Sequence, residues 1–330
     1  MVIASLVADL ERAPAPDELH RQAVVQRAAR TLRPPGAFSR LDPLAAWLAA
    51  WQRTDVPAVA HPALVLAASD HGVVSRGVTS YPSTVTAAMV DAIRAGVATS
   101  AVLAERLGVT LRLVDAGVGH PTADIVEADA LSLERFEHLV TIGRRTVAEL
   151  NADLVAVGEM GIGNTTATAA VAAALYGGDT DAYVGRGAGL DDSGMEVKRQ
   201  VVRDAVARVG QTSPLEVLRR LGGAEHAVLM GVVAEARLRS IPVLLDGYVT
   251  SVVAAVMHAV VAGSTEHCLA AHLSTEPGHR LVLDRLGMTP LLDLGMGLGE
   301  GSGALVALPI VRLAAAAVVD VATFEEWGLA

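Results

Sequence analysis

Residues 153–175 read DLVAVGEMGIGNTTATAAVAAAL, and this stretch contains the pattern that decides the fold. An apolar run (153–157) leads into a glycine-containing loop (158–166), which opens an alanine-rich segment (165–175) of strong helical propensity. A short, continuously apolar run is typical of a strand that is buried on both faces of a parallel sheet. The stretch therefore predicts a strand, a loop and a helix in succession.

The same pattern occurs at five other places in the chain. The further apolar runs are 63–69, 110–115, 241–245, 268–272 and 290–294. Strands that alternate with helices indicate an α/β fold, here a doubly wound, mainly parallel, six-stranded, Rossmann-like sheet. Ligands of such folds bind beyond the carboxyl ends of the strands. We therefore expect the functional site in the loops that follow the six runs, at 70–73, 115–119, 158–166, 246–251, 273–278 and 294–303.

The first 60 residues have a different pattern. Helical spacing of apolar residues occurs over 17–29 and 41–51, and the two segments are joined by a rigid RPPG turn at 33–36. Another apolar helix is expected near the other end, at 303–320. We predict a small helical domain over 1–60 that shares this last helix, and an α/β domain over 61–330.

The composition limits the classes of function. Hydrophobic residues make up 52% and charged residues 19% of the 330, which favours a globular protein with a large core. The net charge of −10 argues against a nucleic-acid or anionic-membrane surface. Cys268 is the single cysteine, so no internal disulfide is expected and a reducing cytoplasm is the predicted location. The most apolar stretch, 303–322, contains Pro309 and Arg312, so no membrane span is expected.

The loop at 158–166 has the features of an anion site. Gly161 and Gly163 let the backbone approach a ligand closely, and Asn164 and Thr165 present N–H groups at the start of the following helix. A plain strand-to-helix turn with an Asn or Thr cap is the alternative. Glu159 would repel a phosphate, so we expect it to orient a sugar hydroxyl or to assist the base.

A second glycine-rich loop, GRGAGLDD, occupies 185–192 and precedes a helix that contains Lys198. The small residues Gly187 and Ala188 allow another backbone approach to a phosphate. Lys198 is the only lysine in a chain that otherwise uses arginine, and its compact charge suits a phosphate. A solvated surface lysine is the alternative reading.

The third loop, LGMGLGEGSG at 294–303, places Glu300 among small and apolar residues. A sheltered carboxylate of this kind can act as a general base. The alternative is a charge that only marks the start of a helix. Ser274 and Glu276 either line the cleft or belong to a turn. The sequence contains neither HExxH nor CxxC, so no metal is expected.

The loops together resemble one known family. Six motifs occur in that family's order, after RPPGAFSRL at 33–41: DHGV (70–73), GEMGIGNTT (158–166), GRGAGLDD (185–192), PVLLDG (242–247), HLSTEPGHR (272–280) and LGEGSGA (298–304). The chain is similar in these motifs to the nicotinate-nucleotide–dimethylbenzimidazole phosphoribosyltransferases. The resemblance extends from about residue 30 to the last helix, so it covers nearly the whole chain.

This resemblance implies transfer of the phosphoribosyl group of nicotinate mononucleotide to 5,6-dimethylbenzimidazole. The products would be α-ribazole 5′-phosphate and nicotinate, made in the assembly of the lower ligand of cobalamin. The resemblance also implies a homodimer that needs no metal or other cofactor. It assigns Glu300 as the catalytic base, with Glu159 beside it. The residues it places around the phosphate and ribose are Gly161, Gly163, Asn164, Thr165, Gly187, Ala188, Lys198 and Ser274.

One region departs from the best-known form of the family. A Ser and a Gln contact the benzimidazole there, whereas the matching positions in this chain are Tyr81 and Met89. Methionine adapts its shape and does not hydrogen-bond strongly. We predict that Tyr81, Met89, Ile162 and Leu298 line a base pocket of relaxed specificity.

Two other functions stay open on the residues alone. A non-catalytic nucleotide-binding protein would use the same phosphate loops and would not need Glu300. An NAD-dependent oxidoreductase would use the GxGxxA match at 299–304, followed by a strand and an acidic residue about 20 positions on. Asp320 has that spacing, but it directly follows the last predicted helix.

Overall fold

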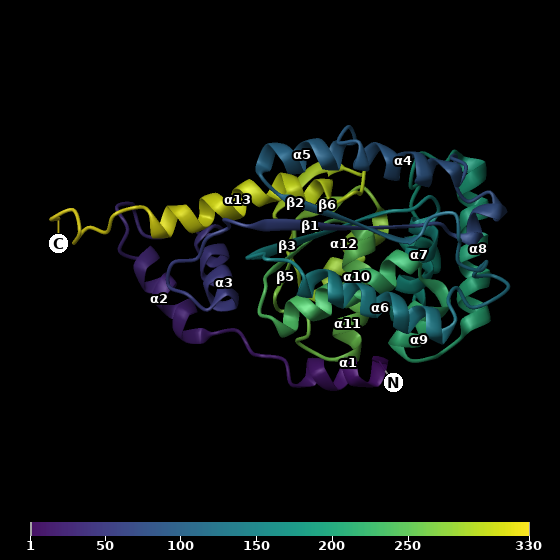
Figure 1. Ribbon diagram of the computed structural model, residues 1–330, viewed down its shortest axis with the longest axis horizontal. Coiled ribbons are helices and arrows are strands. Elements are labelled where there is room, and N and C mark those ends of the chain that lie inside the picture. The colour runs from purple at the N-terminus through teal and green to yellow at the C-terminus, as the bar shows by residue number, and fades with distance from the viewer. Residues whose placement is uncertain (1, 330) are drawn as a thin grey trace.

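The computed structural model describes residues 2–329 (Figure 1). Its main sheet has five parallel strands in the order β2-β1-β3-β4-β5. Almost every residue of β1 and β3 is buried, which explains why these strands are continuously apolar. The strands are β1 (Pro62–Ser69), β2 (Thr110–Gly117), β3 (Leu154–Met160), β4 (Val243–Leu245) and β5 (Cys268–Ala270).

The predicted sixth strand does not join this sheet. The run at 290–294 becomes β7 (Leu292–Met296), which pairs in parallel with β6 (His272–Ser274) as a separate two-stranded sheet. The run at 268–272 divides at Ala271, where the chain leaves β5 and starts β6. Apolar content shows that a strand forms but does not identify its neighbour, so the expectation of one six-stranded sheet was wrong.

Helices cover both faces of the main sheet, as a doubly wound fold requires (Figure 1). One face carries α4 (Thr84–Arg94), α5 (Thr99–Leu107) and α13 (Ser302–Val319). The other carries α6 (Leu133–Ala148), α7 (Asn164–Tyr176), α10 (Ala224–Leu238) and α11 (Tyr248–Val260). Further helices of the α/β part are α8 (Asp192–Val209), α9 (Pro214–Leu221), α12 (Pro277–Leu286) and the 3₁₀ turns η1 (Gly72–Arg76) and η2 (Thr180–Tyr183). Within β1, Val65 belongs to the core of the α10 face and Leu64 to that of the α13 face.

Helices from both ends of the chain pack together beside the sheet and form a small cluster, here called the annex. The helices α2 (Glu18–Ala28) and α3 (Asp42–Gln52) pack with the far part of α13, and Thr31 forms an isolated bridge with Thr323. The first helix, α1 (Val2–Glu11), behaves differently, because Leu6 and Leu10 are buried in the core formed with α6 and α10. The annex therefore lacks α1, and the domain division at residue 60 stays a prediction.

Two segments of the described residues, 84–107 and 302–319, are long and apolar enough to cross a membrane by length and composition. The first is divided into α4 and α5 around Gly96, which has a left-handed φ of +76°. The second is α13, in which the Arg312 guanidinium donates to the backbone oxygens of Val59 and Leu107. Much of α13 is buried against the sheet, so its apolar character serves the core.

Candidate active site

A cavity of about 580 Å³ lies at the carboxyl ends of the strands. The strand order reverses between β1 and β3, and this is where ligands bind in sheets of this type. Every residue that the sequence predicts for the site lines the cavity: Tyr81, Met89, Glu159, Gly161, Ile162, Gly163, Asn164, Thr165, Gly187, Ala188, Lys198, Ser274, Leu298 and Glu300.

Two of the six predicted loops, 70–73 and 115–119, do not line the cavity. The first lies behind it, where His71 bonds to the buried Glu225 of α10 and packs against the 161–163 loop. The second supports the first, because the backbone N–H of Gly119 donates to Asp70. These loops hold the cavity wall in place, and the other four predicted loops line the cavity.

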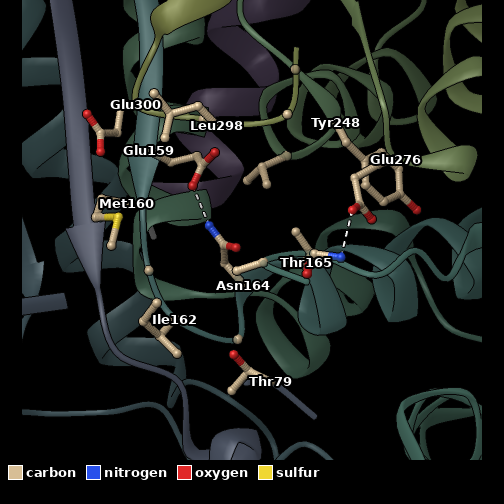
Figure 2. A pocket seen from close by; sticks show the side chains of 18 of the residues that line it. Thr79, Glu159, Met160, Ile162, Asn164, Thr165, Tyr248, Glu276, Leu298 and Glu300 are labelled. Carbon is tan, nitrogen blue, oxygen red and sulfur yellow. Dashed lines mark hydrogen bonds between the residues drawn. The ribbon is translucent and has the colours of Figure 1, made fainter. Parts of the chain in front are cut away.

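Two chain segments meet backbone to backbone at one end of the cavity. Gly299, Glu300 and Gly301 all have left-handed φ angles, of +82°, +60° and +73°. The Glu300 N–H donates to the backbone oxygen of Glu159 at 3.0 Å. A Cβ on Gly158 would lie 2.4 Å from the Gly301 nitrogen, so only glycine permits this approach. The contact places Glu159 and Glu300 side by side (Figure 2).

Glu300 is buried, with 2% of its surface exposed, and a hydrogen bond from α5 holds its side chain in addition to the backbone contacts. Its Oε2 accepts a hydrogen bond from the Ser100 hydroxyl of α5 at 2.9 Å. A non-glycine residue in the left-handed region costs about 1 kcal/mol or more, which is typical of functional positions. Asp246 caps α13, through N–H bonds from Gly301 and Ala304, so Glu300 is not the charge that marks this helix start.

Glu159 and Asp246 both have raised pKa values. Burial raises the pKa of Glu159 to about 8, and the nearby carboxyls of Asp246 and Glu225 add to the effect. Burial likewise raises the pKa of Asp246 to about 7, although backbone N–H bonds oppose the shift. This end of the cavity therefore contains two carboxyl groups whose pKa values lie at about neutral pH or above it.

The start of α7 differs from a simple capped turn. The N-cap is Gly163, which has no side-chain cap, and the Asn164 amide donates instead to Glu159. The capping alternative is therefore wrong. A Cβ on Gly161 would lie 2.7 Å from the Ser69 oxygen, and one on Gly163 would lie 2.7 Å from Val74. Both glycines make room for neighbouring protein atoms as well as lining the cavity.

The other end of the cavity contains the buried Lys198, of which 1% is exposed. Its Nζ donates to Thr165 Oγ1 and to the Gly185 backbone oxygen, both at 2.8 Å. Burial lowers the pKa of Lys198 to about 8, an effect that Glu276 opposes. The solvated-lysine alternative is wrong, and no carboxylate among residues 2–329 forms an ion pair with this ammonium group.

The backbone of the 185–187 loop passes close to Lys198. A Cβ on Gly187 would lie 2.8 Å from Thr165 Oγ1 and 3.3 Å from Lys198 Nζ, which explains the glycine. Its N–H donates to Glu276 Oε1 at 2.9 Å, so the donor expected for a phosphate already has an anionic partner. Glu276 thus lines the cavity (Figure 2). Ser274 lies nearby and bonds to His279.

The predicted base-binding residues gather around apolar space near the carboxyl groups. Tyr81 and Leu298 are half-exposed at the mouth, whereas Ile162 is buried deeper. Met89 packs in a cluster with Met160 at the end of β3. The pocket therefore offers apolar contact with few directional bonds.

Several site residues were not predicted from the sequence. Ser100, Asp246, Met160 and Tyr248 lie in or beside the cavity, and all except Ser100 line it. Asp246 and Tyr248 belong to the loop at 246–251, which follows a predicted strand, and this position was the available signal. Ser100 has no such signal, because its contact with Glu300 spans 200 positions in the sequence.

The structure also bears on the alternatives. Among residues 2–329, no group of three or more His, Cys, Asp or Glu side chains is placed to hold a metal ion. The GxGxxA match lies between β7 and α13, and no strand follows α13 within residues 320–329. The βαβ unit that a dinucleotide site needs is therefore incomplete in the described chain.

Comparisons with known proteins agree with one another. A family model described as phosphoribosyltransferase (DBI_PRT) matches residues 13–329. The nicotinate-nucleotide–dimethylbenzimidazole phosphoribosyltransferase of Methylorubrum extorquens is 46% identical over 98% of this chain and 95% of its own length. The enzyme of the same name from Cereibacter sphaeroides is 41% identical over 99% and 97%. The crystal structure of CobT from Thermus thermophilus superposes with a TM-score of 0.89 at 38% identity, covering 94% of this chain and 99% of that one.

Proposed function

The chain belongs to this phosphoribosyltransferase family, and we propose from that premise that it transfers phosphoribose from nicotinate mononucleotide to 5,6-dimethylbenzimidazole or a related base. The products are α-ribazole 5′-phosphate and nicotinate, which serve the assembly of the lower ligand of cobalamin. The observation that carries the proposal is one cavity with carboxyl groups at one end and a buried lysine at the other.

The donor binds with its phosphate at the Lys198 end. Lys198, the Thr165 hydroxyl and the Gly187 N–H converge there and suit a phosphate in charge and hydrogen bonding. Asn164 and Ser274 lie further along the cavity wall, where the ribose would extend. The anomeric carbon then lies between the two ends.

The acceptor base occupies the apolar pocket of Tyr81, Met89, Ile162 and Leu298. One ring nitrogen attacks the anomeric carbon while the bond from that carbon to the nicotinate nitrogen breaks. The bonding pair returns to the nicotinate ring, which is already cationic and needs no general acid. Attack from the face opposite the leaving group inverts the anomeric centre, and holding both partners in one cavity supplies the proximity that the step needs.

The attacking benzimidazole must lose the proton on its other ring nitrogen, and Glu300 accepts it. A positioned base of this kind contributes roughly 10²–10⁴ in rate. Glu159 is less suited to the task at neutral pH, because it holds its own proton up to about pH 8. Its protonated carboxyl can donate to a sugar hydroxyl, and its neutrality limits repulsion of the Glu300 carboxylate.

We also infer that the protein acts as a homodimer in the cytoplasm. Large apolar side chains are exposed at Leu294, Leu313 and Trp327, and a second copy would cover surface of this kind. Light scattering coupled to size exclusion measures the mass in solution. A mass of one chain at micromolar concentration would contradict the dimer.

The decisive experiment follows nicotinate release from nicotinate mononucleotide with and without dimethylbenzimidazole. We expect release only when the base is present, with an equal amount of α-ribazole 5′-phosphate. A non-catalytic nucleotide-binding protein would bind the mononucleotide and release nothing. An oxidoreductase would instead bind NADH and transfer fluorescence energy from tryptophan, and either result would contradict the proposal.

A further inference from the structure

Glu276 occupies the position in which the proposed function places the phosphate of the donor. Its Oε1 accepts the Gly187 N–H at 2.9 Å, beside Lys198 Nζ and Thr165 Oγ1. A carboxylate and a phosphate have the same preference for such a donor, because both are anionic acceptors. They cannot use this N–H group at the same time.

The second carboxylate oxygen of Glu276 is tightly packed and has no hydrogen-bond partner in the described part of the chain. Oε2 is buried, and among the described residues no donor bonds to it. A Cβ on Gly185 would lie 2.2 Å from Oε2, so the carboxylate packs directly against the Gly185 backbone. A buried oxygen of a charged group costs free energy when it has no hydrogen-bond partner. This cost at Oε2 reduces the net stability of the Glu276 contact with Gly187.

Lys198 completes the arrangement from the other side. Its ammonium group is buried and donates hydrogen bonds to two neutral oxygens, and it attracts the Glu276 carboxylate without forming an ion pair with it. A buried cation of this kind favours a directly bonded anion. A phosphate between Lys198 and Gly187 would satisfy it better than the more distant carboxylate.

The Glu276 side chain can also move away from the Gly187 N–H without disturbing the fold. It is the N-cap residue of α12, but its side chain makes no capping hydrogen bond with that helix. Its backbone is fixed by Pro277 at the first helical position, while the side chain alone spans the gap to Gly187. A rotation of the side chain would release the N–H group.

We propose that Glu276 is a resident anion of the phosphate subsite, that the donor's phosphate must displace it from the Gly187 N–H, and that this competition weakens the binding of the donor's phosphate. This inference rests on the proposed function. A nucleoside without a phosphate cannot displace the carboxylate, so the 185–187 loop keeps its closed contact. A phosphorylated donor replaces that contact with one that also includes Lys198.

The test is a titration of inorganic phosphate into the full-length protein, followed by calorimetry or thermal shift. Glu276→Gln keeps an acceptor for the Gly187 N–H and removes the charge, and Glu276→Ala removes both. We expect both variants to bind phosphate about tenfold more tightly than the wild type, because the like-charge competition is gone. Glu105→Gln on the exposed surface of α5 is the matched charge control and leaves phosphate binding unchanged.

Two further measurements locate the effect. Combining Glu276→Gln with Lys198→Met should abolish the gain in phosphate affinity, because both residues act on one subsite. The ratio of affinities for nicotinate mononucleotide over nicotinate riboside should rise in Glu276→Gln, because only the mononucleotide has to displace the carboxylate. Should Glu276→Ala fail to fold, Glu276→Gln carries the test alone.

Unchanged or weaker phosphate binding in Glu276→Gln would overturn the inference. Equal weakening of mononucleotide and riboside binding, with phosphate binding unchanged, would also overturn it and assign Glu276 to the ribose. Neither result depends on turnover. A wild-type protein that binds phosphate competitively but never releases nicotinate would contradict the proposed function and leave the role of Glu276 standing.

Discussion

The two ends of the cavity differ in how they hold charge. The base end, which we propose binds the acceptor, brings Glu159, Asp246 and Glu300 together under apolar walls, and burial raises the pKa of Glu159 to about 8 and that of Asp246 to about 7. The phosphate end buries one cation, Lys198, against neutral oxygens and keeps the nearest carboxylate at a distance. One end is suited to moving a proton and the other to binding an anion. In Figure 2, Glu159 and Glu300 lie apart from Thr165, to which Lys198 donates. This separation in one cavity lets each end work without neutralising the other.

The largest expected effect is on turnover and comes from substituting Glu300 at the base end of the cavity. Glu300→Gln keeps the side-chain shape and the contact with Ser100, but it removes the proton acceptor. We expect turnover to fall at least ~10²-fold with an unchanged circular dichroism spectrum and melting temperature. Glu105→Gln serves as the control for loss of one glutamate charge. Near-wild-type turnover would transfer the base role, first of all to Glu159.

Removing the charge of Lys198, at the end of the cavity that we propose binds the phosphate, should change substrate binding more than turnover. Lys198→Met fills the same space without a charge, so the KM for nicotinate mononucleotide should rise about tenfold or more. The KM for dimethylbenzimidazole should change much less, because that base binds at the far end. Steady-state kinetics with each substrate varied in turn separates the two. An unchanged KM for the mononucleotide would remove Lys198 from the phosphate subsite.

Ser100 offers a milder way to disturb the base end. Ser100→Ala removes the hydroxyl that bonds Glu300 Oε2, so we expect kcat to fall about tenfold with both KM values nearly unchanged. Ser100→Thr keeps the hydroxyl and should restore most of the activity. Ser264→Ala removes another buried hydroxyl, one without a hydrogen-bond partner in the described chain, and controls for a general packing loss. Equal losses in Ser100→Ala and Ser264→Ala would disprove a positioning role.

The protons at the base end also predict how stability depends on pH. The folded protein holds a proton on Glu159 up to about pH 8, whereas the unfolded chain releases it near the ordinary value of 4.5. Between these values the folded state binds more protons, so the free energy of unfolding contributed by Glu159 falls as the pH rises. Urea unfolding at pH 5, 6.5 and 8 should show this fall. It should be shallower in Glu159→Gln, and an identical slope would contradict the assigned protonation.

The smallest expected effect concerns the choice of acceptor. The pocket of Tyr81, Met89, Ile162 and Leu298 offers mainly apolar contact, so bases of similar shape should be used with similar efficiency. We expect kcat/KM values for dimethylbenzimidazole and benzimidazole within about tenfold of each other, because Met89 can adapt its shape to the space that the two methyl groups leave. Direct competition, with adenine as the third base, measures the preference. Strict use of one base would contradict the relaxed specificity.

The sequence alone predicted those features of the fold and of the site whose physical cause lies in neighbouring residues of the chain. The buried strands read as continuous apolar runs, and the glycines and carboxylates that follow them lie at the carboxyl ends of the strands. Contacts between distant segments were not predictable in this way. The choice of β6 as the partner of β7, the cap that Asp246 provides for α13, and the packing of α1 on α10 each depend on tertiary neighbours.

The same distinction applies within the candidate site. Glu300 was predicted from its glycine-rich surroundings, whereas its partner Ser100 lies in an ordinary helical stretch. Lys198 was singled out by its rarity, yet its burial followed only from the packing of α8 on α7. Glu276 was named as a cleft residue, but nothing in the local sequence indicates that it occupies the Gly187 N–H.

The backbone contact between Gly158 and the 299–301 loop has a consequence for biosynthesis of the protein. On the ribosome, β3 emerges some 140 residues before the segment that completes the site beside it. A nascent chain can therefore form most of its sheet while the paired carboxyl groups are still absent. In the proposed mechanism the base Glu300 belongs to the segment between β7 and α13, so chains that end before this segment would release no nicotinate.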